Sequence, residues 1–494
     1  NTEASIAPRI NEIEEAPDTK LLGGPEGVPG MDKIDKSKLK FPLFPSYRML
    51  VTLLLCFAIM IAYAQRNGLS SVIVCMSIDE TGKGYYDWKT KTGVILGSFY
   101  VGYALLQFLG GYLVARTNAF LTMAFFLTLS SLATLLGPFA ANLGYTSMVT
   151  SRVIAGLGQA VVWPSLYGLA AVWFPKSEMG RLMGYQGSSS ALGTVISLFA
   201  GGQFCKILQG KVYYFSGWAL FFYILGFAGL IWLVFWFMYA SQSPAKCKKI
   251  SKEEKDFISI MTDGATTQIP PVPWVKVVKS KEVWGICLTM MFFDFGLYAT
   301  YTVVPQYLRN ALGYSYDEMG LYSALPHVVC MIGSFINGYL SDMFINKKLL
   351  SKTNCRKLFQ CGSAILVGLS MFLIAFVNQA NRVYAVLLFQ LTGYFISITM
   401  AGGYFVAVAE ISGAYSSVIF GLGNTMSAIA GFLSPTVASG IIGNEVENIV
   451  GRWKIVLMVY AGSMFLAAIV FGLIGSGEIC DWAKPQNERK TDSP

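Results

Sequence analysis

Long apolar runs, separated by short polar connections, dominate this sequence. A helix that crosses a bilayer needs about 20 mostly apolar residues, and roughly twelve segments meet that rule. They lie near 48–76, 92–115, 119–140, 145–174, 181–205, 217–240, 283–308, 319–343, 358–377, 383–409, 415–442 and 453–475. We therefore predict an all-α membrane protein with about twelve transmembrane helices.

The composition agrees with a chain that meets lipid. Of 494 residues, 54% are hydrophobic and 13% are charged, whereas about a quarter of the residues in a soluble domain are charged. The formal net charge is +9, but Lys and Arg gather in loops and at the N-terminus, which is typical of membrane orientation. No basic face with interleaved aromatic residues is visible, so we expect no nucleic-acid partner.

These basic residues set the expected topology. The clusters precede the first segment, follow the sixth, and join the fourth to the fifth and the eighth to the ninth. With twelve spans they all lie on one side, and since cytoplasmic loops carry the excess of Lys and Arg, both termini are predicted to be cytoplasmic. The clusters comprise Lys33, Lys36, Lys38, Lys40, Arg48, Lys176, Arg181, Lys246, Lys248, Lys249, Lys252, Lys255, Lys347, Lys348, Lys352, Arg356 and Lys357.

The longest polar interruption divides the chain into six helices plus six. It contains ISKEEKDF, which predicts a surface helix, and the Pro-rich IPPVPW. The expected parts are a disordered cytoplasmic N-terminus (1–47), two six-helix bundles (48–240 and 283–475), a cytoplasmic linker (241–282) and a cytoplasmic tail (476–494). Two such halves are typical of secondary transporters, which bind substrate between them near the midplane.

The two halves also resemble each other. GGYLVAR ends the second segment and NGYLSDM ends the eighth, and both lie on the expected cytoplasmic side. Gly111, Gly338 and Asp342 from these stretches are the candidate conformational motif.

Two arginines interrupt the apolar runs at similar depth. Arg152 lies about one turn inside the outer end of its segment, and Arg66 lies about 25 Å from the cytoplasmic start of the first segment. A charge at such depth costs at least about 2.5–3.5 kcal/mol, so it usually faces a polar passage. Guanidinium matches the geometry of carboxylate and phosphate, which predicts an anion site formed by both residues. The alternative for Arg152 is snorkelling to the lipid headgroups.

Uncharged and acidic residues in the segments complete the candidate site. Gln159 shares a helix face with Arg152, and Gln159 and Tyr298 are expected to line the substrate path. Asn424 is a candidate substrate contact, with a helix-packing hydrogen bond as the alternative. Asp294 and Glu410 are candidates for coupling a cation, H⁺ or Na⁺, and the alternative for Asp294 is an ion pair with one of the arginines.

Enzyme chemistry finds no support in the sequence. GxSxG, Walker A, HExxH and a GxGxxG motif after a strand are all missing, and we expect no catalytic residue, metal site or cofactor. The single histidine, His327, is expected to be structural. The nine cysteines contain no CxxC pair, and we expect neither a disulfide framework nor a zinc site. Without an ATP-binding domain, uphill transport must use an ion gradient.

Several ordered motifs resemble the organic-anion branch of the major facilitator superfamily, which holds sialin, the vesicular glutamate transporters and the type I sodium–phosphate cotransporters. The resemblance covers about 45–483. It includes WKTKTGVILGSFYVGYALLQFLGGYL (88–113), RVIAGLGQAVVWPSLYGLAAVWFPKSEMGRL (152–182), YSSVIFGLGNTMSAIAGFLSP (415–435) and SGEICDWA (476–483). It implies the major facilitator fold and alternating access for a small anion.

The resemblance also implies roles for single residues. Arg66 and Arg152 match the two arginines with which the family binds substrate anions. Leu96 matches the sialin-like members, whereas the glutamate carriers have histidine there. Gln159 replaces a glutamate tied to proton coupling in sialin and the glutamate carriers; since glutamine cannot titrate, it favours sodium coupling or facilitated exchange. Of the family's run at the end of the tenth segment, Glu410 is the acidic residue that remains.

We therefore predict a secondary active transporter of small organic or inorganic anions that is coupled to a cation gradient and acts as a monomer. The alternatives are a sodium-dependent phosphate- or urate-like carrier, an uncoupled exchanger, and, in another class, a membrane sensor or scaffold with the same fold. DTKLL (18–22) resembles an acidic dileucine sorting signal. The plasma membrane and a lysosomal or vesicular membrane are therefore both candidate locations.

Overall fold

A computed structural model describes residues 41–77, 86–88, 91–175, 178–206, 216–262, 272–443 and 448–484. The DTKLL motif and most of the predicted disordered N-terminus lie outside these residues.

The first group of helices, which we call the N-terminal half, begins with the first predicted segment. Its helices are α2 (Tyr47–Met76), α3 (Thr92–Arg116), α4 (Ala119–Leu135), α5 (Gly137–Leu143), α6 (Tyr145–Ala160), α7 (Val162–Trp173), α8 (Met179–Lys206) and α9 (Gly217–Tyr239). Two short helices follow in the linker, α10 (Lys252–Met261) and α11 (Trp274–Lys279).

The second group is the C-terminal half. Its helices are α12 (Lys281–Thr302), α13 (Val304–Asn310), α14 (Tyr316–Asn346), α15 (Lys352–Ile374), α16 (Val383–Gly402), α17 (Tyr404–Ser412), α18 (Ser416–Ile442) and α19 (Ile449–Ile474). Each predicted apolar segment thus coincides with one helix or with two consecutive helices. In the described part of the chain, nine helical stretches are long and apolar enough to cross a membrane, or ten if the bent pair α4 and α5 is one span.

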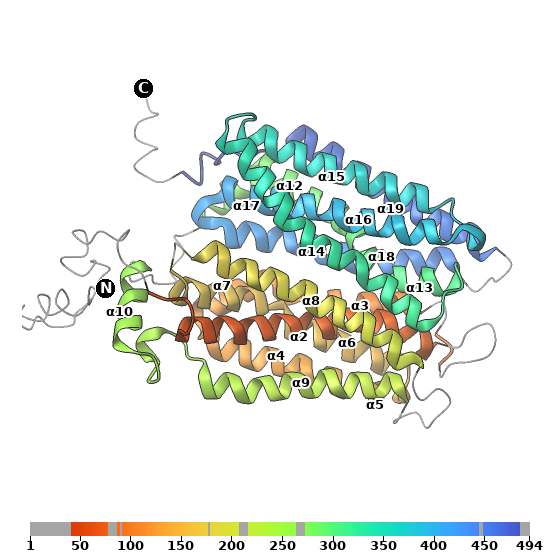
Figure 1. Ribbon diagram of the computed structural model, residues 1–494, viewed down its shortest axis with the longest axis horizontal. Coiled ribbons are helices and arrows are strands. Elements are labelled where there is room, and N and C mark those ends of the chain that lie inside the picture. Colours follow the sequence, from red (N-terminus) through yellow and green to blue (C-terminus); the bar gives the residue numbers. More distant parts are fainter. Residues whose placement is uncertain are drawn as a thin grey trace, which may run out of the picture.

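Helices of each half pack mainly on one another, and Figure 1 shows the two groups side by side. In the N-terminal half α2 packs on α8 and α9, and α3 packs on α6. In the C-terminal half α12 packs on α18 and α19, and α14 packs on α16. The main contacts between the halves are α3 with α18 and α8 with α14, so these four helices border the interface between the halves.

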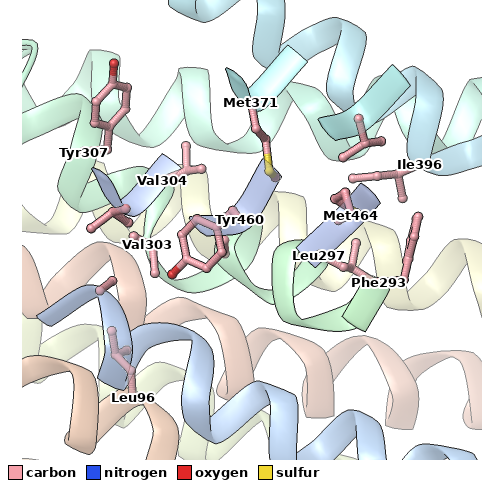
Figure 2. Packing of buried hydrophobic residues seen from close by; sticks show 14 of the residues in the cluster. Leu96, Phe293, Leu297, Val303, Val304, Tyr307, Met371, Ile396, Tyr460 and Met464 are labelled. Atoms are coloured by element: carbon pink, nitrogen blue, oxygen red, sulfur yellow. The ribbon is translucent and has the colours of Figure 1, made fainter. Parts of the chain in front are cut away.

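Apolar side chains fill the interior of the C-terminal half. Figure 2 shows Phe293 and Leu297 of α12 near Ile396 of α16 and Met464 of α19, all of them buried. Because lipid tails are as apolar as these side chains, close van der Waals packing holds such helices together.

At one end of the molecule the two halves meet backbone to backbone. A Cβ atom on Gly93 of α3 would overlap the Pro435 carbonyl oxygen of α18, and one on Gly202 of α8 would lie 2.5 Å from the Tyr316 carbonyl oxygen of α14. Gly320 of α14 in turn lies against α8 backbone. Small residues allow such close approach between membrane helices, and here they close the interface.

Glycines on the same helix faces lack this close contact toward the opposite end. Gly184 lies about five turns from Gly202 on α8, and Gly338 lies about five turns from Gly320 on α14, which places each pair on one face. A Cβ atom on Gly184 or on Gly338 would meet nothing within 4 Å. The halves are therefore closed at the first end, and near Gly184 and Gly338 the faces of α8 and α14 have no such contact among the described residues.

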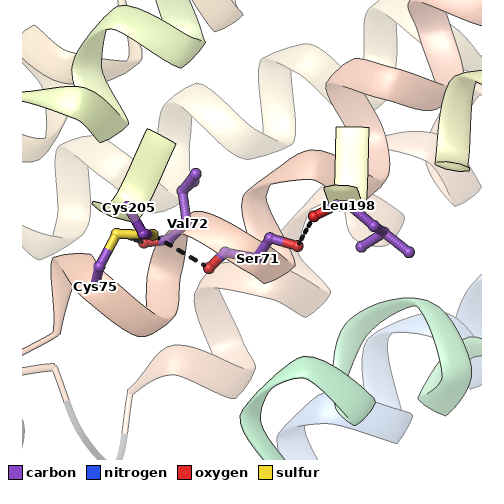
Figure 3. Close-up of a disulfide and its surroundings, with 5 residues drawn as sticks. All are labelled: Ser71, Val72, Cys75, Leu198 and Cys205. Atoms are coloured by element: carbon purple, nitrogen blue, oxygen red, sulfur yellow. Dashed lines mark hydrogen bonds between the residues drawn. A yellow bond between two sulfur atoms is a disulfide. The ribbon is translucent and has the colours of Figure 1, made fainter. Parts of the chain in front are cut away.

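A disulfide corrects the expectation of no disulfide framework. Cys75 near the end of α2 is bonded to Cys205 near the end of α8, with 5.8 Å between their Cα atoms. Beside it, Ser71 Oγ donates a hydrogen bond of 3.1 Å to the Leu198 carbonyl oxygen (Figure 3). The two cysteines are 130 residues apart, so no local spacing in the sequence pointed to the pair.

The surface helix expected from ISKEEKDF is present as α10, and it is fastened to α2. Ser251 caps α10, and the Glu254 carboxylate accepts hydrogen bonds from the backbone N–H groups of Tyr47 (2.8 Å) and Arg48 (2.9 Å). A carboxylate at a helix N-terminus satisfies donors that the helix leaves free. The buried Arg48 also forms an ion pair with Glu178 at 2.9 Å, so the linker helix belongs structurally to the N-terminal half.

Candidate functional site

Arg66 lies on α2 among three aromatic rings. Its guanidinium carbon is 4.8 Å from the ring centroid of Tyr63, 4.9 Å from that of Phe99 and 4.5 Å from that of Tyr103. Stacking on aromatic faces orients a guanidinium without neutralising its charge. The side chain makes no hydrogen bond or ion pair with any residue that the structure describes, and the residue is only 8% exposed.

Arg152 of α6 lies against α2. Its Nη1 atom donates to the Gln65 carbonyl oxygen (3.3 Å), and its Nη2 atom donates to the Arg66 carbonyl oxygen (3.1 Å). The guanidinium carbon is 5.2 Å from the Phe99 ring centroid. Arg152 is 3% exposed and points into the half, so the snorkelling alternative does not describe its geometry.

Glycines bring Arg152 to this place. A Cβ atom on Gly156, one turn after Arg152, would overlap the Phe99 carbonyl oxygen, and one on Gly102 would overlap the Val153 carbonyl oxygen. The backbones of α3 and α6 therefore touch, which sets Arg152 and Arg66 around the same ring, that of Phe99. Both predicted arginines thus meet in one place.

Gln159 belongs to a polar cluster inside the N-terminal half. Its Nε2 atom donates to Ser130 Oγ of α4 (3.0 Å) and lies 3.5 Å from Gln65 Oε1 of α2. Gln65 Nε2 in turn donates to Ser131 Oγ (3.0 Å). The structure places Gln159 beside these helices, and not with the rings around Arg66.

Asp294 of α12 is buried in the C-terminal half and accepts hydrogen bonds from hydroxyl groups. The Tyr404 hydroxyl donates to Oδ1 (2.7 Å), and Ser427 Oγ donates to Oδ2. The Tyr298 hydroxyl lies 3.1 Å from Ser427 Oγ. The ion pairs within the described residues do not include Asp294, so the alternative of a pair with an arginine does not describe its geometry.

Aromatic and amide contacts join the two halves here. The Tyr100 ring of α3 lies 4.6 Å from the Tyr298 ring of α12. Asn424 Nδ2 of α18 donates to the Tyr103 hydroxyl (3.2 Å), and the ring of Tyr103 is one of the three around Arg66. The structure therefore brings Arg66, Tyr298 and Asn424 into one inter-half site.

Glu410 lies elsewhere. Its carboxylate accepts two hydrogen bonds of 2.7 Å from Arg356, a bidentate ion pair that joins α17 to α15. Arg356 also donates to Ser341 Oγ of α14 (2.8 Å). Glu410 is about 9 Å along α17 from Tyr404, the partner of Asp294. The pair connects three helices of the C-terminal half, and its carboxylate is already neutralised.

The candidate conformational motif is described in part. Gly111 is in α3 and Asp342 is in α14, but their side-chain surroundings lie outside the described part of the chain. Gly338 lies beside open space on α14.

Sequence reasoning missed the aromatic and hydroxyl neighbours of the charged residues. They are Tyr63, Phe99, Tyr100 and Tyr103 around the arginines, and Tyr404 and Ser427 around Asp294. One signal was available, since Phe99 and Tyr103 are four residues apart and so share a helix face.

Two helical halves with an unneutralised basic site at their interface are the architecture of a membrane transporter. The sequence matches the Major Facilitator Superfamily over residues 55–435, and the chain belongs to this family. Its relatives include human sialin, 28% identical with 96% of each chain covered, and an uncharacterized transporter, slc-17.2, of Caenorhabditis elegans, 29% identical with 90% and 94% covered. Vesicular glutamate transporter 1 of Xenopus laevis is 26% identical, with 89% and 76% covered.

Solved structures show the same fold. The D-xylose–proton symporter superimposes with a TM-score of 0.67 at 16% identity, covering 87% of this chain and 99% of that chain. A bacterial homologue of the human lysosomal transporter Spinster, in an inward-facing conformation, superimposes with a TM-score of 0.66 at 14% identity, covering 87% and 97%. The predicted family and fold class are confirmed, and the matched proteins are transporters, not enzymes.

Proposed function

We propose that this chain is a secondary active transporter of small anions, and that Arg66 is the residue that binds the anion. The observation that carries the proposal is a pair of buried guanidinium groups, Arg66 and Arg152, for which the described residues supply no carboxylate. A charge buried in this way is unfavourable in a membrane unless a partner neutralises it. An anion from solution would be that partner, and sialin and the vesicular glutamate transporters are relatives.

The two arginines have different roles in this proposal. The Nη atoms of Arg66 have no protein partner among the described residues, so they are free to form two parallel hydrogen bonds to a carboxylate or a phosphate. The Nη atoms of Arg152 hold the carbonyl groups of Gln65 and Arg66. Arg152 is therefore a positioning residue that also contributes positive charge. Tyr298 and Asn424 lie at the same inter-half site but belong to the C-terminal half, so a bound anion would contact both halves.

Asp294 is the proposed coupling residue, since it is a buried carboxylate next to this site. Its hydroxyl partners can bond to it in either protonation state, so it can take up and release a cation. Asp294→Asn keeps the shape but cannot ionise. In this variant we expect the rate of uptake with an imposed proton or sodium gradient to equal the rate without one. Anion binding should remain.

Uptake into proteoliposomes tests both statements. Labelled aspartate, sialate, urate and phosphate are offered with proton and sodium gradients imposed separately. The exposed Asp481, which pairs with Lys484 near the end of the described chain, gives the control variant Asp481→Asn. Gradient-driven uptake in Asp294→Asn that equals wild type would remove Asp294 from coupling. No movement of any anion in the wild type would favour the sensor or scaffold.

We further propose that both termini are cytoplasmic. Disulfides persist in oxidising compartments, so the end of α2 and α8 that holds Cys75–Cys205 faces the lumen or the exterior. The predicted orientation from Lys and Arg places the same end outside. The closed end in this structure is then the outer one.

An epitope tag added after Pro494 checks this orientation. In cells whose plasma membrane alone is permeabilised, we expect an antibody to reach the tag. A tag that becomes accessible only after the internal membranes are opened, or that is accessible on intact cells, would contradict the proposed orientation.

A further inference from the structure

Two buried polar side chains on α14 each have an atom without a hydrogen-bond partner among the described residues. The backbone of Thr300 bonds to the His327 imidazole, which leaves Nε2. Ser323 is 1% exposed and His327 is 7% exposed, and among the described residues Ser323 Oγ and His327 Nε2 have no hydrogen-bond partner. They are four residues apart and therefore share a helix face. Buried polar groups are nearly always hydrogen-bonded in folded proteins, so two such atoms on one helix face point to a ligand.

Aromatic contacts connect this face to the arginines. The His327 imidazole is stacked on the Tyr301 ring, with 4.7 Å between centroids. Tyr301 lies 6.1 Å from Tyr298, and Tyr298 lies 4.6 Å from Tyr100 of the N-terminal half. The imidazole is thus at the C-terminal side of the same inter-half site.

A third unpartnered group lies between the arginines and His327. The Tyr100 hydroxyl is buried and has no partner among the described residues, and it is within electrostatic range of Arg66 and Arg152. Polar groups free to bond therefore extend from the arginines through Tyr100 to His327.

We propose that Ser323 and His327 form a specificity subsite for the uncharged polar part of an organic anion whose charged group is held by Arg66. This inference rests on the proposed function and deepens it. Tyr301 and Tyr298 stand between His327 and Tyr100 in the series of ring contacts, and an anion with a carbon skeleton and a hydroxyl, amide or amino group can bond at both ends of this series. The new element is the subsite itself: Ser323 and His327 select, among anions, those that carry such a group.

The single histidine makes a direct test possible. Diethyl pyrocarbonate modifies imidazole nitrogen, and mass spectrometry of the peptide that contains His327 reports the reaction in the purified full-length protein. Glutamate, aspartate, sialate and phosphate are added at saturating concentration. We expect the organic anion that binds most tightly to slow the modification at least about tenfold, because at ten or more times its Kd at most about a tenth of the protein is free, and phosphate to leave it unchanged.

Binding by the variants His327→Gln and Ser323→Ala provides the second measurement. Each is expected to lower the affinity for the organic anion about tenfold, the effect of one lost hydrogen bond in a dry site, with phosphate affinity unchanged. Ser334→Ala is the matched control, because Ser334 Oγ on the same helix already donates to the Cys330 carbonyl oxygen (2.8 Å). Arg66→Gln should weaken both kinds of anion.

Each outcome separates the two proposals. If an organic anion binds but neither protects His327 nor responds to Ser323→Ala, the subsite is wrong and the transporter assignment stands; a bound water then satisfies these atoms. If phosphate is the single anion that binds, the subsite is again overturned. If the wild type binds no anion, the proposed function fails and this inference fails with it. Should His327→Gln not fold, Ser323→Ala and the protection experiment decide.

Discussion

Arg66→Gln is expected to lower anion affinity by a factor of at least about 30 while the protein stays folded. Removing one partner of a buried, hydrogen-bonded charge pair costs about 2–5 kcal/mol, and each 1.4 kcal/mol is about tenfold. Gln stays polar, but it is shorter than Arg and has neither the charge nor the planar fork of donors. Because Arg66 forms no hydrogen bond or ion pair with a described residue, its replacement removes only the contacts with the three rings. Equilibrium binding to purified protein, with its melting temperature, measures both effects.

Two variants show whether charge or geometry decides. Arg66→Lys keeps the positive charge and loses the planar fork, so we expect an intermediate affinity. Arg382→Gln is the control, since Arg382 is also stacked on a ring, 4.3 Å from that of Tyr314, and donates to backbone carbonyl groups there. Wild-type affinity in Arg66→Gln would show that the anion binds elsewhere.

Gly93→Ala is expected to stop the halves from closing at the disulfide end. The added Cβ would lie much closer than 3.0 Å to the Pro435 carbonyl oxygen, and backbone cannot move aside as a flexible side chain can. Overpacking of this kind costs about 1–3 kcal/mol, which shifts the ratio of closed to open molecules by about 5- to 150-fold. Uptake should slow to a similar degree. The helix itself should not be weakened, because Ala has a higher helix propensity than Gly.

The matched control is Gly440→Ala, near the same end of α18, where a Cβ would meet nothing within 4 Å. Opening can be observed at Thr92, whose hydroxyl lies 3.3 Å from Ser439 Oγ across the interface. A cysteine placed at Thr92, with the free cysteines replaced, should react with an impermeant thiol reagent faster when Gly93 is Ala. Unchanged uptake together with an unchanged reaction rate would show that this contact does not close the interface.

The sequence predicted most of the fold because bilayer thickness imposes a length on every spanning helix. Apolar run lengths therefore located the helices, and the break after Ala160 agrees with Pro164, which cannot donate to the carbonyl group four residues earlier. Arg66 and Arg152 were recognisable as candidates because a charge at that depth in the membrane is costly and therefore usually functional. The depth of a residue in the membrane follows from its position in its apolar segment, and this position was enough to select these two residues.

Neighbours across the fold could not be obtained in the same way. Asn424 and Tyr103 are 321 residues apart, and no periodicity relates them. Glu410 has the depth of a coupling carboxylate at the end of its segment, but the sequence does not say that Arg356 lies opposite it. Gln159 shares a helix face with Arg152, yet its side-chain amide donates a hydrogen bond to Ser130 of α4. In each case the partner's identity, more than the residue's own depth, determines its role.

The covalent link between α2 and α8 lies wholly within one half. It therefore leaves any movement of one half against the other unconstrained, while this end of the N-terminal half stays a fixed unit. Reduction of that bond would loosen one half without changing the contacts between the halves. The redox state of the compartment that this end faces would therefore affect the stability of the protein more than its rate of transport.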